Sequence, residues 1–217
     1  MKLIGIGDNV VDRYADLKKM FPGGNALNVA VLCKRFGIDT GYIGCLGTDV
    51  AGIHILNTLK EEGVDVSRIK ILEGTNAYCN VALVNNDRTF ISSDKGVSQN
   101  ITLDSEDIEY IKTYDLIHTS IYSGIESLLP ELKKTKVKIS LDYSNDFSQD
   151  YIKRTIPYVD YAFFSGSEMP ESNIREFQEY ISSLGPELVL VTKGDKGAFL
   201  YYQGKYYEQS IVETEVV

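Results

Sequence analysis

The stretch GGNALNVAVLCKRFG, residues 23–37, has the features of one complete amphipathic helix. Its apolar residues recur at spacings of three and four, which place side chains on one side of a helix. They are Ala26, Val29, Ala30 and Cys33. Gly37 follows them, and glycine is the commonest residue just beyond the end of a helix. The spacing therefore predicts a helix over residues 24–36 with one buried side.

The start of this helix is rich in hydrogen-bonding groups. Asn25 and Asn28 stand there beside the backbone amide of Gly24, and Asp12 adds a carboxylate a little upstream. Hydroxyl groups both donate and accept hydrogen bonds, so amides and a carboxylate suit a ligand with several hydroxyls. The structural alternative is that Gly24 makes the turn, Asn25 caps the helix and Asn28 faces solvent. Spacing alone leaves both interpretations open.

On either side of this segment, short β-type runs alternate with helical patterns. The β-type runs cover residues 2–7, 41–46, 115–120, 138–143, 160–164 and 187–192. A second helix follows Asp49 and extends through Leu59, with Gly63 after it. Such alternation is typical of a mostly parallel sheet covered by helices, so the predicted class is α/β. No linker or repeat marks a boundary, and one domain over residues 1–217 is expected.

Residues 76–94 interrupt this alternation. Their polar and apolar residues alternate on both sides of Asn85, Asn86 and Asp87, which favour a turn, so a β-hairpin is predicted. A hairpin without its own helix either extends a sheet edge or covers a site as a flap. A second hairpin is predicted around residues 203–205.

Composition restricts the partners and the compartment. The 31 acidic and 22 basic residues give a net charge of -9, which repels a nucleic-acid backbone. Cys33, Cys45 and Cys79 are odd in number and form no CxxC pair, so a reducing compartment is expected. No apolar run approaches the ~18 residues of a membrane span. These features predict a cytoplasmic protein with no nucleic-acid or membrane partner.

Several familiar motifs are missing from the sequence. Gly5 and Gly7 suggest a dinucleotide-binding turn, but Val10 occupies the position of its third glycine. Neither a GxxxxGK[ST] loop nor a GxSxG elbow occurs, which argues against P-loop hydrolysis and acyl transfer. His54 and His118 have no further ligand at metal-binding spacing, so structural roles are expected for both.

The segment at residues 23–37 resembles the first signature of the ribokinase-like (phosphofructokinase B type) carbohydrate kinases, GGxAxNxA. GDNVVDRY at 7–14 resembles the opening strand of that family, with its sugar-binding aspartate at Asp12. LGTDVAGIHILNTLKEEGVDVS at 46–67 resembles a further family stretch, and the hairpin at 76–94 lies where these kinases carry a lid. The resemblance covers nearly the whole chain. It implies a ribokinase-like three-layer α/β/α sandwich with a mostly parallel sheet and a small β lid.

The resemblance also implies an ATP-dependent sugar kinase with Mg²⁺. VTKGDKGAFLY at 191–201 resembles the family's nucleotide loop, TxGxxG. The implied substrate-binding residues are Asp12, Gly24, Asn25 and Asn28. The implied nucleotide-binding residues are Ser165, Thr192, Lys193, Gly194 and Gly197. The family's NxxE motif occurs as Ser165-Gly166-Ser167-Glu168, which keeps the acid but not the amide, and Glu168 is implied to act indirectly on the metal.

The family's GAGD segment, which carries the catalytic base, has no match up to Val217. The resemblance therefore implies a longer kinase whose base follows Val217, and an inactive chain without it. The alternative from another class is a binding module that captures a polyol without turnover. An in-frame Gly-Ala-Gly-Asp within about a dozen residues downstream in the gene would favour the kinase.

Within the family, GDNVVDRY, GGNALNVAV, NNDRTF and YDLIHTSIYS are most similar to the subfamily that phosphorylates fructoselysine at the 6-position. This implies partners for a zwitterionic tail, with Asp8 near the ammonium and Arg88 or Lys95 near the carboxylate. Arg88 alternatively lies in solvent. Another sugar or a nucleoside is the alternative substrate. The exposed edges of the hairpin also allow a homodimer through the lid.

Overall fold

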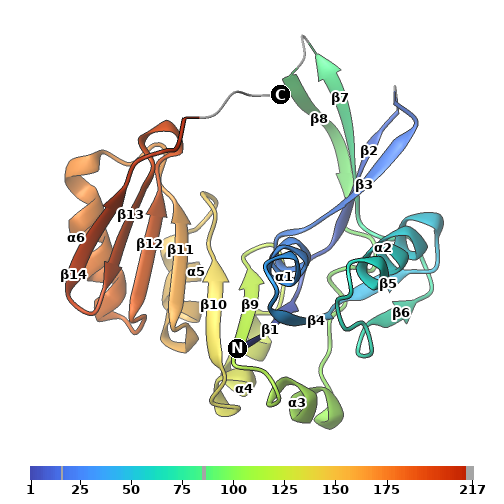
Figure 1. Cartoon of the computed structure of the whole chain (residues 1–217), viewed down its shortest axis with the longest axis horizontal. Coiled ribbons are helices and arrows are strands. Elements are labelled where there is room, and N and C mark those ends of the chain that lie inside the picture. Colours follow the sequence, from blue (N-terminus) through green and yellow to red (C-terminus); the bar gives the residue numbers. More distant parts are fainter. Residues whose placement is uncertain (16, 85–86, 214–217) are drawn as a thin grey trace. The chain divides into compact units, whose positions relative to one another are not determined.

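The computed structural model describes residues 1–15, 17–84 and 87–213. The chain divides into two compact units, Met1–Val137 and Lys138–Val217, whereas the sequence pattern had marked no boundary. Each unit has its own strands and helices (Figure 1). Among the described residues, no helix combines the length and the apolarity needed to cross a bilayer.

The amino-terminal unit is built on three parallel strands. β1 (Lys2–Ile6) lies between β4 (Asp39–Ile43) and β9 (Leu116–Ser120). Helix α1 (Asn25–Arg35) packs on these strands and buries Ala26, Leu27 and Ala30. The predicted helix over residues 24–36 is therefore confirmed to within one residue at each end. At its end, the N–H of Ile38 donates to the carbonyl oxygen of Cys33 across Gly37.

The remaining elements of this unit surround the three strands. Helix α2 (Val50–Glu61) begins at Asp49, whose side chain accepts a hydrogen bond from the Gly52 N–H at 3.0 Å, as the sequence predicts. The predicted strand 41–46 is split into β4 and β5 (Cys45–Gly47), and β5 pairs with β6 (Lys70–Leu72). The helices that complete the unit are α3 (Ser105–Ile111), η1 (Glu126–Leu128) and α4 (Leu129–Lys134).

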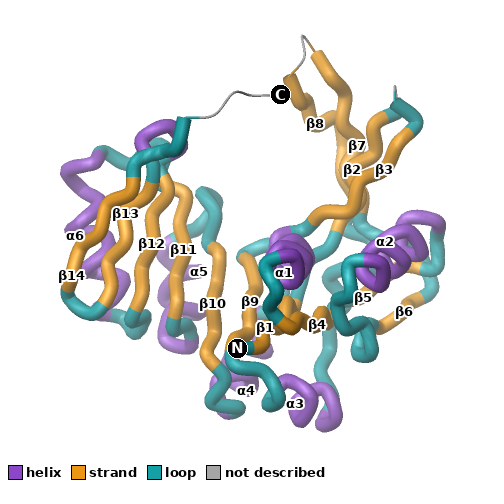
Figure 2. Tube along the Cα trace, viewed as in Figure 1, coloured by secondary structure: helices purple, strands orange, loops and turns teal. Residues whose placement is uncertain are grey.

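A separate four-stranded sheet also belongs to the amino-terminal unit (Figure 2). Its order is β3 (Lys19–Gly23), β2 (Val10–Tyr14), β7 (Tyr78–Val84) and β8 (Asp87–Asp94). β7 and β8 confirm the hairpin predicted at 76–94, although its turn residues Asn85 and Asn86 lie outside the described residues. The β2–β3 hairpin was not predicted. It gives the hairpin at 76–94 a second pair of strands, because β2 pairs with β7 in parallel.

The carboxy-terminal unit carries a mixed sheet. β10 (Lys138–Asp142), β11 (Tyr161–Ser165) and β12 (Leu188–Thr192) are parallel, and the hairpin of β13 (Ala198–Tyr202) and β14 (Lys205–Gln209) adds two antiparallel strands. All these strands agree with the sequence pattern. Helices α5 (Gln149–Thr155), η2 (Ile156–Tyr158) and α6 (Glu171–Ser183) belong to the same unit. Its core includes the stacked rings of Tyr143 and Phe164, whose centroids are 4.6 Å apart.

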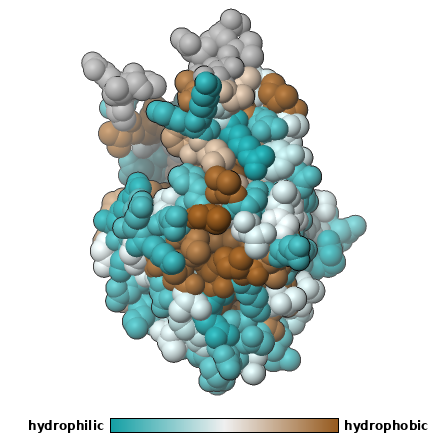
Figure 3. Space-filling model, turned by 90° about the vertical axis from the view of Figure 1, so that its right-hand side faces the viewer, coloured by the Kyte–Doolittle hydropathy of each residue, from teal (hydrophilic) through white to brown (hydrophobic). Residues whose placement is uncertain are grey.

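Apolar side chains also gather on the surface that carries α2 (Figure 3). Val50 and Ile53 of α2 are 71% and 53% exposed, and Phe21, on the face of β3 turned away from the core, is 47% exposed. The other side of β3 is anchored to α2, because His54 contacts the carbonyl oxygen of Met20 at 3.2 Å. The four-stranded sheet is therefore attached to the body of this unit and still exposes apolar surface.

Candidate functional site

The start of α1 is held by a carboxylate from the loop after β1. Asp8 accepts hydrogen bonds from the backbone N–H groups of Asn25 at 2.5 Å and Ala26 at 3.3 Å. The hydroxyls of Ser120 and Ser123 donate to the same carboxylate at 2.7 Å and 2.8 Å. A negative group at a helix start pairs with unsatisfied N–H groups and with the helix dipole. Asp8 therefore has a structural role here, and its suggested role beside a substrate ammonium is not supported.

Asn25 does not cap the helix. The N-cap residue is Gly24, which has no side chain, so the alternative interpretation of Asn25 is wrong. Instead, the Asn25 side-chain oxygen lies 2.8 Å from Nε2 of His118. Asn28 is exposed one turn later, and residues three apart lie on the same side of a helix. The two amides thus lie together at the start of α1.

Gly24 has a structural reason to be glycine. Its φ of 109° is rarely adopted by other residues, and an added Cβ would lie 2.6 Å from the Asn9 Cα atom and from the Asp8 carbonyl oxygen. The backbone of Asp8 and Asn9 therefore lies too close to Gly24 to leave room for a side chain there. Any contact of Gly24 with a ligand would come from its backbone.

Asp12 lies on β2, close to the start of α1 in the fold. The register places Val10 opposite Gly23, and Asp12 opposite Phe21 of β3 and Cys79 of β7. Val11 is fully buried in the core that includes α2, so Asp12 lies on the other face of the sheet. Tyr14 shares that face, and its ring meets the ring of Phe21 edge-on at 5.6 Å.

The structure therefore brings four of the five predicted substrate residues to one corner, built from β2, β3 and α1. They are Asp12, Gly24, Asn25 and Asn28. The fifth, Arg88, is on β8, and its side chain lies outside the described part of the structure.

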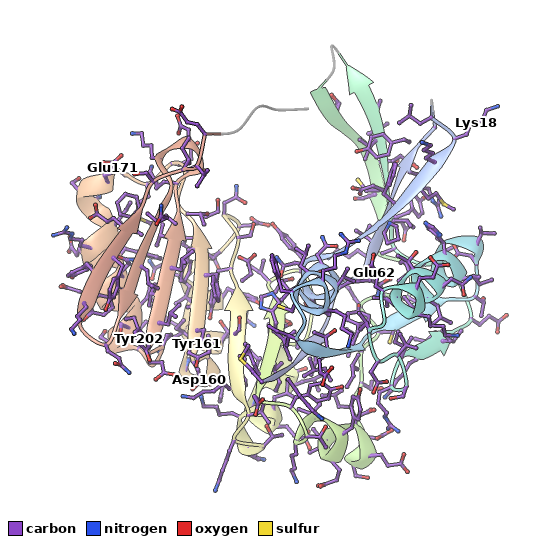
Figure 4. All side chains as sticks on the ribbon, viewed as in Figure 1. Lys18, Glu62, Asp160, Tyr161, Glu171 and Tyr202 are labelled. Atoms are coloured by element: carbon purple, nitrogen blue, oxygen red, sulfur yellow. The ribbon has the colours of Figure 1, made fainter. Side chains whose placement is uncertain are left out.

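The predicted nucleotide residues meet at one end of the sheet in the carboxy-terminal unit. Ser165 ends β11 and Thr192 ends β12, and the two are register partners. A pocket of about 340 Å³ adjoins Ser165 and is lined by Asn145, Phe147 and residues 165–169. Asp160 and Tyr161 lie at the opposite end of these strands (Figure 4). Ligands of open α/β sheets bind beyond the carboxyl ends of the strands, where this pocket lies.

The loop after β12 adds the glycine turn. The short helix η3 (Gly194–Lys196) follows Lys193, whose N–H donates to the Gly197 carbonyl oxygen at 2.7 Å. Gly194 has a φ of 57°, and no heavy atom lies within 4 Å of the position its Cβ would take. No other described part of the chain therefore packs against this side of Gly194.

Lys193 is 7% exposed, and its ammonium group donates to the carbonyl oxygens of Ser167 at 2.8 Å and Met169 at 2.5 Å. The side chain therefore ties the glycine turn to the turn that carries Glu168. Glu168 itself is exposed. In the described part of the chain, no group of three or more His, Cys, Asp or Glu side chains is arranged to bind a metal ion.

Two of the residues that shape the first site were not assigned to it from the sequence. His118 was expected to be structural, and Ser120 was not singled out. Both lie on β9, two positions apart and hence on the same face of the strand. The only available signal was the segment YDLIHTSIYS, which contributed to the family resemblance without showing which residue contacts what.

One unit of this α/β protein presents amides and a carboxylate around a helix start, and the other presents strand-end hydroxyls and a glycine turn. Such groups suit a polyol and a nucleotide, the two ligands of small-molecule kinases. The model of the pfkB family carbohydrate kinases matches residues 3–217. The chain belongs to the pfkB family of carbohydrate kinases.

Two kinases are similar in sequence to the chain over 99% or more of its length. The chain is 43% identical to fructosamine kinase FrlD of Bacillus subtilis (strain 168) over 221 residues, which cover 100% of this chain and 78% of that protein. It is 34% identical to fructoselysine 6-kinase of Escherichia coli (strain K12), over 99% of this chain and 82% of that protein.

Solved structures confirm the predicted ribokinase-like fold. Arabidopsis thaliana ribokinase, solved with ribose and ATP, matches with a TM-score of 0.81 and 20% identity over 97% of this chain and 78% of that chain. Aminoimidazole riboside kinase from Salmonella enterica, solved with its riboside and an ATP analogue, matches with a TM-score of 0.77 and 21% identity. This second match covers 100% of this chain and 79% of that chain.

Proposed function

We propose that this protein is an ATP-dependent kinase that phosphorylates fructoselysine at its 6-hydroxyl. The observation that carries the proposal is the similarity over the whole chain to two kinases named for fructosamine and fructoselysine, at 43% and 34% identity. The chain is 28% identical to fructokinase of Klebsiella pneumoniae, less than to either of these two kinases. A sugar-amine is therefore better supported than a bare sugar.

The residues at the start of α1 fit the sugar part of this substrate. The Asp12 carboxylate would accept hydrogen bonds from sugar hydroxyls, and the Asn25 and Asn28 amides would contact further oxygens. Phosphoryl transfer depends mainly on alignment and charge neutralisation, so a rigid set of polar groups is what the reaction requires of the protein. No residue of this chain is proposed as the catalytic base.

The carboxy-terminal unit fits a nucleotide. The open space beside Gly194, the hydroxyls of Ser165 and Thr192, and the pocket of about 340 Å³ lie at the same strand ends. ATP with Mg²⁺ would supply the transferred phosphoryl group and the cation that neutralises its charge. Ser165, Thr192, Gly194 and Gly197 would hold the nucleotide, Lys193 would fix the turn beside it, and the exposed Glu168 would act on the metal indirectly.

The substrate is tested by comparing turnover in the full-length protein. We expect kcat/KM for fructoselysine to exceed that for fructose, ribose and adenosine by at least about tenfold, the difference that one good additional contact provides. Equal or better use of fructose or adenosine would contradict the fructoselysine assignment and leave membership of the family intact.

We also propose that the hairpin at residues 76–94 is part of a lid over the sugar. The support is its place in the four-stranded sheet that also carries Asp12. Lids close when substrate binds and exclude water from the reacting group. Hydrogen exchange of the backbone amides at 76–94 is expected to slow when fructoselysine is added, and unchanged exchange there would count against a lid.

The same sheet is the proposed surface for a homodimer. Its edge strands are β3 and β8, and each exposes a large apolar side chain, Phe21 at 47% and Ile91 at 62%. Unpaired strand edges and exposed apolar side chains favour association with a second copy. A cytoplasmic location is proposed as well, supported by the three cysteines, none of which forms a disulfide in the described part of the chain.

A further inference from the structure

Lys193 places a buried ammonium group at the start of the glycine turn after β12. The residue is 7% exposed, and Nζ donates to the carbonyl oxygens of Ser167 at 2.8 Å and Met169 at 2.5 Å. Both acceptors are neutral, and among the described residues no carboxylate pairs with this ammonium group. A buried charge without a counter-charge is costly, and its field favours a negative group nearby.

The ammonium group fixes the direction of one peptide group in a neighbouring turn. The N–H of Met169 donates to the Gly166 carbonyl oxygen at 2.9 Å and closes this turn. Inside it, the Ser167 carbonyl oxygen is bound by Lys193, and the peptide bond to Glu168 is trans. The C=O and N–H of a trans peptide group point in opposite directions. The N–H of Glu168 therefore points away from the ammonium group.

The pocket of about 340 Å³ lies against the same turn. Its lining includes Ser167 and Glu168 but not Lys193, so the turn separates the ammonium group from the pocket. In the described part of the chain, no protein group accepts a hydrogen bond from the Glu168 N–H. This donor is available to a ligand, and the ammonium group strengthens it by polarising the peptide group through the carbonyl oxygen.

We propose that Lys193 is a positioning residue for the phosphate chain of the nucleotide, and this inference rests on the function proposed above. Lys193 holds the Ser167 carbonyl oxygen, and the Glu168 N–H at the other end of that peptide group donates to a phosphate oxygen. Oriented backbone N–H groups and fixed positive charge suit phosphate, and groups oriented in advance lose less freedom on binding. The Glu168 side chain takes no part in this contact.

The first test replaces Lys193 in the full-length protein. Lys193→Met has similar length but neither charge nor N–H donors, and it is expected to raise KM for ATP about tenfold while KM for fructoselysine stays within about twofold. Lys193→Arg keeps the charge and the donors and should recover most of this loss. Lys196→Met is the matched control, because Lys196 lies in the same turn but is exposed and pairs with Glu171 at 3.1 Å. Its KM for ATP should stay within about twofold of wild type.

A second measurement follows the hydrogen bond directly. In the wild-type protein without sugar, ATP should move the amide proton resonance of Glu168 downfield in a ¹⁵N–¹H spectrum, because the acceptor is charged. Adenosine has no phosphate and should leave this resonance nearly unchanged. In Lys193→Met saturated with ATP, the shift should fall below about half of the wild-type value, since the polarising charge is gone.

The outcomes distinguish this inference from the proposed function. Failure of the wild-type protein to bind ATP would contradict the proposed function, and this inference with it. If ATP binds but leaves the Glu168 resonance in place, or if adenosine moves it equally, the phosphate contact is overturned and the proposed function stands.

The kinetic constants decide the role of Lys193 separately. Equal KM for ATP in Lys193→Met and Lys196→Met would overturn it, and so would a parallel rise in KM for fructoselysine, which indicates a general structural defect. If Lys193→Met does not fold, the comparison of Lys193→Gln with Lys193→Arg decides, because both keep N–H donors and only arginine keeps the charge. Equal KM for ATP in these two variants would then overturn the role of the charge.

Discussion

Replacement of Asp12 by alanine is expected to weaken fructoselysine binding roughly a hundredfold or more and to leave the protein folded. Asp12 lies on the face of β2 opposite the buried Val11, so its loss creates no cavity in the core. Hydrogen bonds to a charged group contribute about 1.5–3 kcal/mol each, and two sugar hydroxyls would lose their acceptor. Titration calorimetry on the full-length protein measures the change.

Two further variants are compared with Asp12→Ala in the same affinity measurement. Asp12→Asn keeps an acceptor oxygen but removes the charge, so it should fall between wild type and Asp12→Ala. Asp39→Ala is the matched control, since Asp39 begins β4 in a different sheet from Asp12, is 73% exposed and pairs with Lys34 at 3.2 Å. Wild-type affinity in Asp12→Ala would remove Asp12 from the sugar site.

The parallel strands and α1 were predictable because their signals are local. Each buried strand is a short apolar run, and α1 has its apolar spacing and terminal glycine within residues 23–37. The β2–β3 hairpin was not predictable in this way. β3 contains Pro22, which weakens a strand pattern, and β2 is supported by β7, where Val11 pairs with the distant Tyr78.

The residues of the candidate sugar site could likewise be predicted only where the signal lies within a short segment. Asn25 and Asn28 could be proposed from the sequence because the chemistry of an amide at a helix start is visible in a short segment. The groups that fix Asn25 could not, since His118 is 93 residues away along the chain and Ser120 is 112 residues from Asp8. Only the fold brings β9 beside the start of α1.

A second large effect is expected at Asn9, which lies between β1 and β2 and is 2% exposed. Its side-chain NH₂ donates to the Tyr42 hydroxyl at 3.1 Å and to the Cys45 carbonyl oxygen at 3.0 Å. Its oxygen accepts from Asn76 and from the Ser98 hydroxyl, both at 3.0 Å. Asn9 thus links the three parallel strands to the segment that leads into β7.

Substitution Asn9→Leu is expected to lower the free energy of unfolding by about 3 kcal/mol, because a side chain of similar size would leave buried polar groups without a partner. For a chain of this size that corresponds to a fall in Tm of roughly 6–12 °C, measurable by thermal unfolding. The four-stranded sheet should be affected most, since Asn76 also accepts the Gly47 N–H at 3.1 Å and lies two residues before Tyr78, the first residue of β7.

Asn80→Ala is the control for this substitution. Asn80 is an asparagine of β7 whose side chain donates to the Ser92 hydroxyl at 2.9 Å in an exposed setting. Its loss should change stability by less than about 0.5 kcal/mol, because water replaces an exposed partner. A Tm of Asn9→Leu equal to that of Asn80→Ala would show that the Asn9 network does not hold the four-stranded sheet to the rest of its unit. A large fall confined to Asn9→Leu, with faster hydrogen exchange in β7, would locate the attachment of the sheet at Asn9.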